Sequence, residues 1–145
     1  MSQNFFSIWI HLVWTTKRRQ PLIHRQLKKP LYDKMREIAN EKDFRIDFIN
    51  GVEDHVHLLI SIQPKHSVSD IVKHLKGITN SWVNKNQLTL DYFEWQDGFS
   101  AFSVSPLQLQ KVRNYIRYQE KHHKSKGFDD EMQHFGRLTN SIKSY

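Results

Sequence analysis

The chain has 145 residues, with 22 Lys and Arg against 15 Asp and Glu, a formal net charge of +7 and no cysteine. The lack of cysteine excludes a disulfide scaffold, a thiolate metal site and a cysteine nucleophile. A mean hydropathy of −0.68 is typical of a soluble protein, and no run approaches the roughly 18 apolar residues of a membrane-spanning helix. The positive charge favours a polyanionic partner such as nucleic acid. Since the N-terminus also lacks the features of a signal peptide, we expect one cytoplasmic domain over residues 1–145.

Residues 5–16 predict the first strand, because the run is rich in β-branched and aromatic side chains on both faces. It contains His11, which we expect to be a hydrogen-bonded histidine of the core or of a site wall. A basic cluster, Lys17-Arg18-Arg19, follows directly. A basic cluster at the end of a strand can hold phosphates, and a solvated loop is an equally good interpretation.

A helix and a hairpin are predicted next. Apolar side chains at three- and four-residue spacing predict a helix over residues 26–43. Residues 44–50 and 55–62 alternate as strands, and Asn50-Gly51 predicts the tight turn between them.

The second half of the chain predicts a helix over residues 67–86, an ordered loop over 87–99, a strand over 100–105 and a helix over 107–125. Residues 126–145 form a polar tail that we expect to be mostly irregular. The order of elements predicts an α+β, ferredoxin-like fold. In this fold an antiparallel four-stranded sheet carries helices on one face, and here an additional C-terminal helix follows. RNA-recognition modules share this plan, so the fold alone does not select a function.

Two histidines one residue apart open the predicted strand 55–62. Because side chains alternate along a strand, His55 and His57 project from one face, with backbones about 6 to 7 Å apart. At that separation both imidazoles can bind one metal ion. The alternative is a pair of buried, hydrogen-bonded histidines, which is the more common case for an isolated His-x-His.

The predicted helix 107–125 is the most basic element of the chain. At about 100° per residue, Tyr115, Gln119 and His122 fall on one stripe of this helix. A phenol, an amide oxygen and an imidazole beside guanidinium groups could act on a phosphodiester. Two histidines and one amide oxygen would leave open metal positions, as a catalytic site requires. An ordinary amphipathic helix with a solvated basic face is the alternative. The cations of this face are Arg113, Arg117 and Lys124.

These residues resemble those of a known family, the single-tyrosine HUH transposases of small bacterial insertion sequences, with REP-associated tyrosine transposases as near relatives. The resemblance is carried by four stretches in a fixed order: residues 11–18, His55-Val56-His57, residues 95–105 and residues 115–123. Any one of these stretches is a weak signal, and their joint occurrence in this order is specific.

The resemblance implies a metal-dependent DNA transposase that cuts and rejoins single-stranded DNA through a 5′-phosphotyrosine. Tyr115 would be the nucleophile, and His55, His57 and Gln119 would bind Mg²⁺ or Mn²⁺. Tyr118 is the rival nucleophile, but it lies about 60° from the Gln119 stripe. We further expect DNA contacts from basic residues and a site wall from three others. The basic residues are Lys17, Arg18, Arg19, Arg113, Arg117, Lys121 and Lys124, and the wall residues are His11, Tyr118 and His122.

The resemblance also implies partners and a location. The substrate would be single-stranded DNA with hairpins at the ends of the mobile element, and the protein would be a homodimer with no membrane partner. The tyrosine helix of one subunit can complete the histidine site of the other in this family. The location would be the bacterial cytoplasm, with association to the nucleoid during the reaction. Two alternatives stay open, a domesticated REP-type relative that acts on chromosomal hairpins and a non-catalytic RRM-like nucleic-acid-binding protein. A Rep- or relaxase-type nickase fits less well, because its extra domains have no room in 145 residues.

Overall fold

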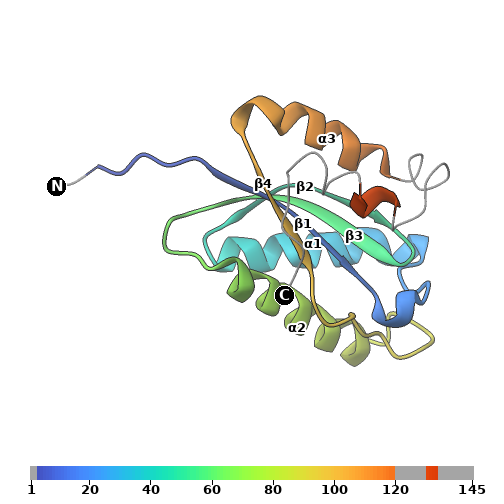
Figure 1. Ribbon diagram of the computed structural model, residues 1–145. Helices are drawn as coiled ribbons and strands as arrows, with labels where there is room; N and C mark the ends of the chain where they lie inside the picture. Colours follow the sequence, from blue (N-terminus) through green and yellow to red (C-terminus); the bar gives the residue numbers. More distant parts are fainter. Residues whose placement is uncertain (1–2, 120–129, 134–145) are drawn as a thin grey trace.

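The computed structural model describes residues 3–119 and 130–133. A four-stranded antiparallel sheet in the order β2-β3-β1-β4 forms its centre (Figure 1). This is the α+β, ferredoxin-like arrangement that the order of elements predicts. The strands are β1 (Ile8–Thr15), β2 (Arg45–Val52), β3 (His55–Ile62) and β4 (Ser100–Val104).

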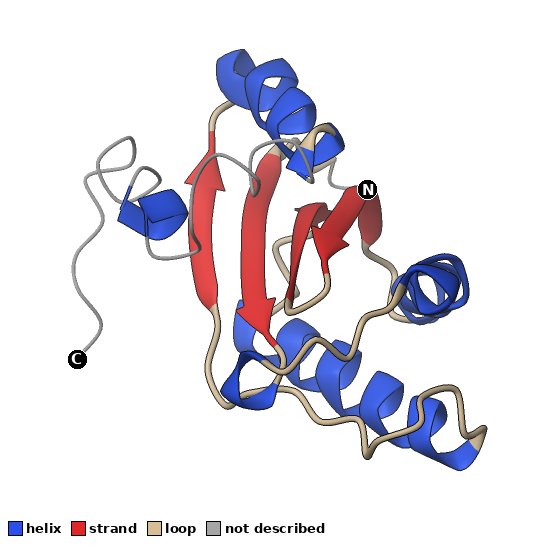
Figure 2. Cartoon of the chain, turned by 90° about the vertical axis from the view of Figure 1, so that its right-hand side faces the viewer, coloured by secondary structure: helices blue, strands red, loops and turns tan. Residues whose placement is uncertain are grey.

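The helices lie on both faces of the sheet (Figures 1 and 2). Helices α1 (Arg25–Glu41) and α2 (Val68–Lys85) cover one face, and α3 (Leu109–Arg117) lies on the other, against β2 and β3. The hydrophobic core fills the space between the sheet and the first two helices. The opposite face of the sheet is therefore available for α3 and a functional site. The core includes Leu12, Trp14, Leu27, Leu31, Met35, Val56, Leu58, Ile60, Ile71 and Leu75.

The alternation of side chains along β3 decides which residues reach each face. Val56 and Leu58 belong to the core on the helical side, while His55 and His57 project to the side of α3 and are also buried. Each buried apolar side chain of this kind contributes about 1.5–3 kcal/mol to folding. A register slip of one residue would exchange the two sets, so core packing fixes the direction of both histidines.

The hairpin between β2 and β3 differs from its prediction. Asn50-Gly51 is not the turn but lies within β2, and residues 53–54 form the turn. Gly51 pairs with Val56 in the sheet, and a Cβ at Gly51 would stand only 2.3 Å from the carbonyl oxygen of His55. Glycine is required here by the close approach of two backbones, so the Asn-Gly signal has a different cause from a turn.

The C-terminal region also differs. The predicted helix 107–125 begins as a short 3-10 helix, η2 (Pro106–Gln108), and continues as α3, which ends at Arg117. Tyr118 leaves helical geometry with φ −102° and ψ 29°. In the tail expected to be irregular, residues 130–133 are helical, and the rest lies outside the described residues.

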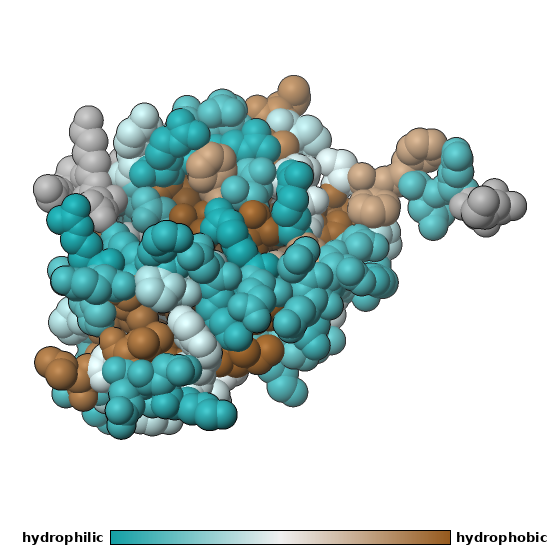
Figure 3. All heavy atoms as spheres, turned by 180° about the vertical axis from the view of Figure 1, so that it is seen from behind, coloured by the Kyte–Doolittle hydropathy of each residue, from teal (hydrophilic) through white to brown (hydrophobic). Residues whose placement is uncertain are grey.

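One face of the molecule is largely polar. Figure 3 shows one face, on which hydrophilic side chains predominate and apolar ones form smaller patches. The first described residues extend away from the sheet, and Phe5 is almost fully exposed there (Figure 1). Among the described residues, no helix has the length and apolar character needed to cross a membrane.

Candidate active site

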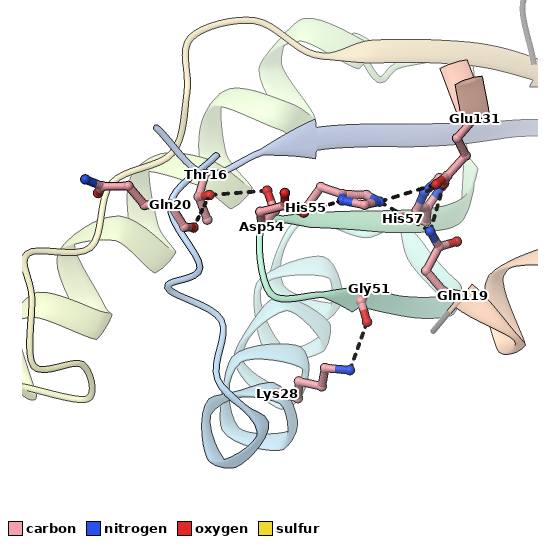
Figure 4. Close-up of polar contacts among 9 residues, drawn as sticks. All are labelled: Thr16, Gln20, Lys28, Gly51, Asp54, His55, His57, Gln119 and Glu131. Atoms are coloured by element: carbon pink, nitrogen blue, oxygen red, sulfur yellow. Dashed lines mark hydrogen bonds and ion pairs between the residues drawn. The ribbon is translucent and has the colours of Figure 1, made fainter. Parts of the chain in front are cut away.

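The two histidines of β3 face the same site. His55 and His57 are both fully buried, and their ring centroids lie 5.3 Å apart. His57 stands in the middle of the sheet, paired with Asn50 of β2 and Val13 of β1. Figure 4 shows both imidazoles directed toward Gln119 and Glu131. The alternation of side chains along β3 thus brings both imidazoles to one face of the sheet, as the sequence predicts.

Helix α3 is held on the sheet by contacts of three kinds. Ile116, on the face of the helix that meets the sheet, is fully buried. The Asn50 amide donates to the carbonyl oxygens of Ile116 and Arg117 at 3.1 and 3.2 Å, which caps the C-terminal end of the helix. Arg113 forms an ion pair with Asp47, with 2.6 Å between Nε and Oδ2. Together these contacts fix the rotation of α3 about its axis.

That rotation brings Tyr115 to the histidines of its own chain. The Tyr115 ring centroid lies 5.8 Å from that of His57, in an edge-to-face arrangement. Tyr118, the rival tyrosine, is 53% exposed. The structure therefore brings Tyr115, and not Tyr118, into the site with the paired histidines.

Gln119 reaches the site although α3 ends two residues earlier. Its side chain is buried, with Nε2 3.2 Å from Nε2 of His55 and 2.8 Å from Oε1 of Glu131. Its Oε1 is buried and has no hydrogen-bond partner among the described residues. A half-turn of the amide would present this oxygen to the imidazoles, and the two amide orientations have nearly the same shape.

Glu131 is a member of the site that the sequence did not predict. It lies in the helical segment 130–133 and is buried between the two histidines. Its Oε1 contacts Nε2 of His57, and its Oε2 lies 3.7 Å from Nε2 of His55. One ligand atom from each of the three side chains lies within 4.8 Å of the others, so the cluster could hold a metal ion. A single glutamate in a polar tail carries no periodic signal that would have marked it.

The charges of the site are coupled through Glu131. Burial alone would raise the pKa of Glu131, but hydrogen bonds from His55 and His57 outweigh it and hold this pKa well below its usual range. Burial likewise disfavours a protonated His55, yet hydrogen bonds to Asp54 and Glu131 raise its pKa. Burial and the carboxylate of Glu131 raise the pKa of the Tyr115 phenol. The site therefore favours a charged carboxylate beside a neutral phenol.

Two further side chains contact the outer nitrogens of the histidines. His11 is buried, and its Nε2 lies 2.8 Å from Nδ1 of His57. Burial and the neighbouring His57 lower the pKa of His11 well below its usual value. Asp54 Oδ1 lies 2.7 Å from Nδ1 of His55. The structure thus places His11 beside His57, and its role as a wall of the site stays a prediction.

The basic cluster after β1 forms a short 3-10 helix, η1 (Lys17–Arg19). Arg18 and Arg19 are exposed, and both have left-handed backbones with φ of 55° and 54°. Such conformations cost a non-glycine residue about 1 kcal/mol or more and are frequent at functional sites. Lys17 is paired with Glu94 at 2.7 Å. Arg18 and Arg19 are therefore the members of this cluster that face solvent.

The basic residues of α3 have structural contacts. The Arg113 guanidinium lies 5.7 Å from the centre of the Trp9 ring, and that of Arg117 lies 5.2 Å from the Phe48 ring. Their geometry seats the helix on aromatic side chains of the sheet. Three of the predicted residues lie outside the described residues, namely Lys121, His122 and Lys124.

Comparisons with known proteins agree on one family. The family model described as "Transposase IS200 like" matches residues 4–119. The ISDra2 transposase TnpA of Deinococcus radiodurans is 28% identical over 119 residues, which are 79% of this chain and 85% of that protein. The transposase of insertion sequence element IS200 from Salmonella typhimurium is 26% identical over 114 residues, covering 75% of this chain and 74% of that protein.

Solved structures show the same fold. A crystal structure of a candidate transposase from Deinococcus radiodurans has a TM-score of 0.63 at 24% identity and covers 82% of this chain and 98% of its own. A REP-associated tyrosine transposase bound to a REP hairpin has a TM-score of 0.62 at 15% identity, with coverage of 85% and 74%. Because the family match spans most of the chain, the protein belongs to the IS200-like transposases, a family of DNA strand-transferring enzymes.

Proposed function

We propose that this transposase cuts and rejoins single-stranded DNA at hairpin-bearing ends through a 5′-phosphotyrosine on Tyr115. A divalent cation, Mg²⁺ or Mn²⁺, would be held by His55 and His57 with oxygen ligands from Gln119 and Glu131. The observation that carries the proposal is the meeting of the Tyr115 ring with His57 at 5.8 Å, on the sheet face that also holds Gln119.

The side chains of the site suit such a cation. The buried Oε1 of Gln119 has no hydrogen-bond partner among the described residues, and Oε2 of Glu131 meets Nε2 of His55 only at 3.7 Å. Buried polar atoms without partners are costly, and a cation would satisfy both. A mixed set of imidazole, amide and carboxylate ligands suits Mn²⁺ and, through its oxygens, also Mg²⁺. When bound, the cation would polarise the non-bridging oxygens of the phosphate.

The residues of the chain supply the remaining parts of the reaction. The Tyr115 oxygen forms the new bond to phosphorus, and the bond between phosphorus and the 3′ oxygen breaks. The 3′ oxygen takes up a proton and leaves as a hydroxyl. The phenol gives its proton to solvent in this step, because Glu131, whose pKa is held below the usual range, is too weak a base to keep it. Rejoining is the reverse attack by a 3′ hydroxyl on the phosphotyrosine, so it needs no external energy source.

The site is proposed to act with residues of one chain. Helix α3 packs against β2 and β3 of its own subunit, which places Tyr115 beside its own His57. The homodimer expected from the family resemblance would then carry two complete sites. A site shared between subunits would require α3 to leave its contacts with Asn50 and Asp47.

The test is covalent capture of the DNA. Single-stranded hairpin DNA with a labelled end is incubated with the protein and Mn²⁺, and the products are separated on a denaturing gel. The REP hairpin bound by the structural relative makes a hairpin the first substrate to try. We expect a protein–DNA adduct that is lost in Tyr115→Phe and kept in the matched control Tyr118→Phe. An adduct that depends on Tyr118, or one that forms fully in His57→Ala, would refute the assignment.

A further inference from the structure

The two histidines of the site have different partners on the nitrogens that face away from it. We propose that His11 and Asp54 are positioning residues, which set the tautomers of His57 and His55 in the cation-bound protein so that Nε2 of each ring is left for the cation. This inference rests on the proposed cation site. It adds two residues with a specific task to that site.

The hydrogen bond between His57 and His11 allows only one placement of the shared proton if His57 is to bind a cation through Nε2. Nδ1 of His57 and Nε2 of His11 lie 2.8 Å apart, both rings are buried, and their centroids are 5.0 Å apart. A hydrogen bond between two neutral imidazoles contains a single proton. If Nε2 of His57 is a ligand, the proton sits on Nδ1 and is donated to His11. His11 must then be the tautomer that carries its own proton on Nδ1.

The pairing of His55 with Asp54 reaches the same result through a charged partner. Oδ1 of Asp54 lies 2.7 Å from Nδ1 of His55, and an ionised carboxylate only accepts hydrogen bonds. The His55 proton is therefore drawn to Nδ1, which leaves Nε2 facing Gln119 (Figure 4). Asp54 is itself held, because its carbonyl oxygen accepts hydrogen bonds from the backbone N–H of Thr16 at 2.9 Å and from its hydroxyl at 3.2 Å.

The two outer partners differ in charge. A carboxylate partner makes an imidazole a stronger electron donor, whereas a neutral histidine fixes the tautomer with less effect on basicity. Loss of an outer partner of a metal ligand typically costs about 10- to 100-fold in metal affinity. We expect Asp54→Ala to fall in that range, Asp54→Asn to cost less because it keeps an acceptor, and His11→Phe to cost about tenfold.

The test reads the tautomers directly. Long-range ¹H–¹⁵N spectra of the full-length protein loaded with Mg²⁺, which is diamagnetic, report which nitrogen of each ring carries the proton. The cation is needed because the Glu131 carboxylate faces both Nε2 atoms and would draw a proton to them in its absence. We expect Nδ1–H tautomers at His55 and His57 in the wild type, and a shift of His57 toward Nε2–H in His11→Phe. His11→Gln offers an amide oxygen as acceptor and should restore the Nδ1–H form. His74→Phe, on α2 across the core, is the control and should change neither ring.

Mn²⁺ binding by calorimetry gives the second readout. We expect the affinity to fall in His11→Phe and to recover at least in part in His11→Gln. A wild-type His57 with its proton on Nε2 would overturn the inference without any variant, as would a His11→Phe protein with an unchanged His57 tautomer. A wild type that binds neither Mg²⁺ nor Mn²⁺ would refute the proposed cation site, whereas a wild type that binds the cation with the His57 proton on Nε2 would refute only the roles of His11 and Asp54.

Discussion

The ion pair between Arg113 and Asp47 should control how firmly the tyrosine helix is seated. Arg113 contacts both carboxylate oxygens of Asp47, with Nε at 2.6 Å from Oδ2 and Nη2 at 3.4 Å from Oδ1. The two side chains are only 26% and 15% exposed, and the guanidinium also lies over Trp9. We choose Arg113→Met, which keeps the aliphatic stem, and Asp47→Asn, which keeps the shape.

The expected coupling energy follows from this partial burial. Exposed ion pairs contribute about 0.2–1 kcal/mol, and hydrogen bonds to charged groups contribute about 1.5–3 kcal/mol. A two-pronged pair at intermediate burial should therefore give a coupling of about 1–2 kcal/mol. Since 1.4 kcal/mol is about a factor of ten in an equilibrium constant, undocking of α3 should become about tenfold more frequent in each single variant.

Two measurements check this expectation. A double-mutant cycle in urea gives the coupling energy, and hydrogen exchange of the amides of residues 109–117 reports the opening of α3. We expect exchange in α3 to accelerate while the amides of β1 and β3 keep their protection. The exposed pair Lys29–Asp33 on α1 serves as the matched control and should couple by less than about 0.5 kcal/mol. A coupling at Arg113–Asp47 no larger than this control, with unchanged exchange in α3, would refute the reasoning.

Three further outcomes are expected. A mixture of Tyr115→Phe and His57→Ala proteins should form no adduct with hairpin DNA, because each chain completes its own site; recovery of the adduct in the mixture would show a site shared between subunits. Mn²⁺ affinity should weaken as the pH falls through the raised pKa of His55, since a protonated ring cannot be a ligand, and an affinity that stays constant on the acid side of neutrality would contradict this. Glu131→Gln should lower Mn²⁺ affinity about tenfold or more in calorimetry. Asp130→Asn, at an exposed neighbouring residue, should leave the affinity unchanged. Equal effects of the two substitutions would argue against Glu131 as a ligand.

Regular periodicity made the central part of the site predictable. Residues of β3 alternate without interruption, and the core demands Val56 and Leu58, so the direction of His55 and His57 follows from the sequence. The apolar residues of α3 set its rotation in the same way, with Ile116 buried beneath the helix. The prediction of a turn at Asn50-Gly51 was wrong because tertiary contacts explain both residues. Gly51 lies against the backbone of β3, and the Asn50 side chain caps the end of α3. A local signal cannot distinguish these causes from a turn.

The sequence marks Arg113 and Arg117 as candidate DNA contacts by their charge, and the structure adds that both also contact the sheet. A guanidinium group seats a helix well when an aromatic ring or a carboxylate lies beneath it, and Arg113 and Arg117 have such partners in the sheet. Sequence reading assigns these cations the same charge as Arg18 and Arg19, whose exposure at η1 follows from a backbone that turns twice into the left-handed region. Glu131 shows the converse case, because a residue of the polar tail is buried by two imidazoles from a distant strand. The net charge of the chain therefore predicts the class of its partner. Which cations are exposed to that partner depends on the side chains that lie beneath each of them in the sheet.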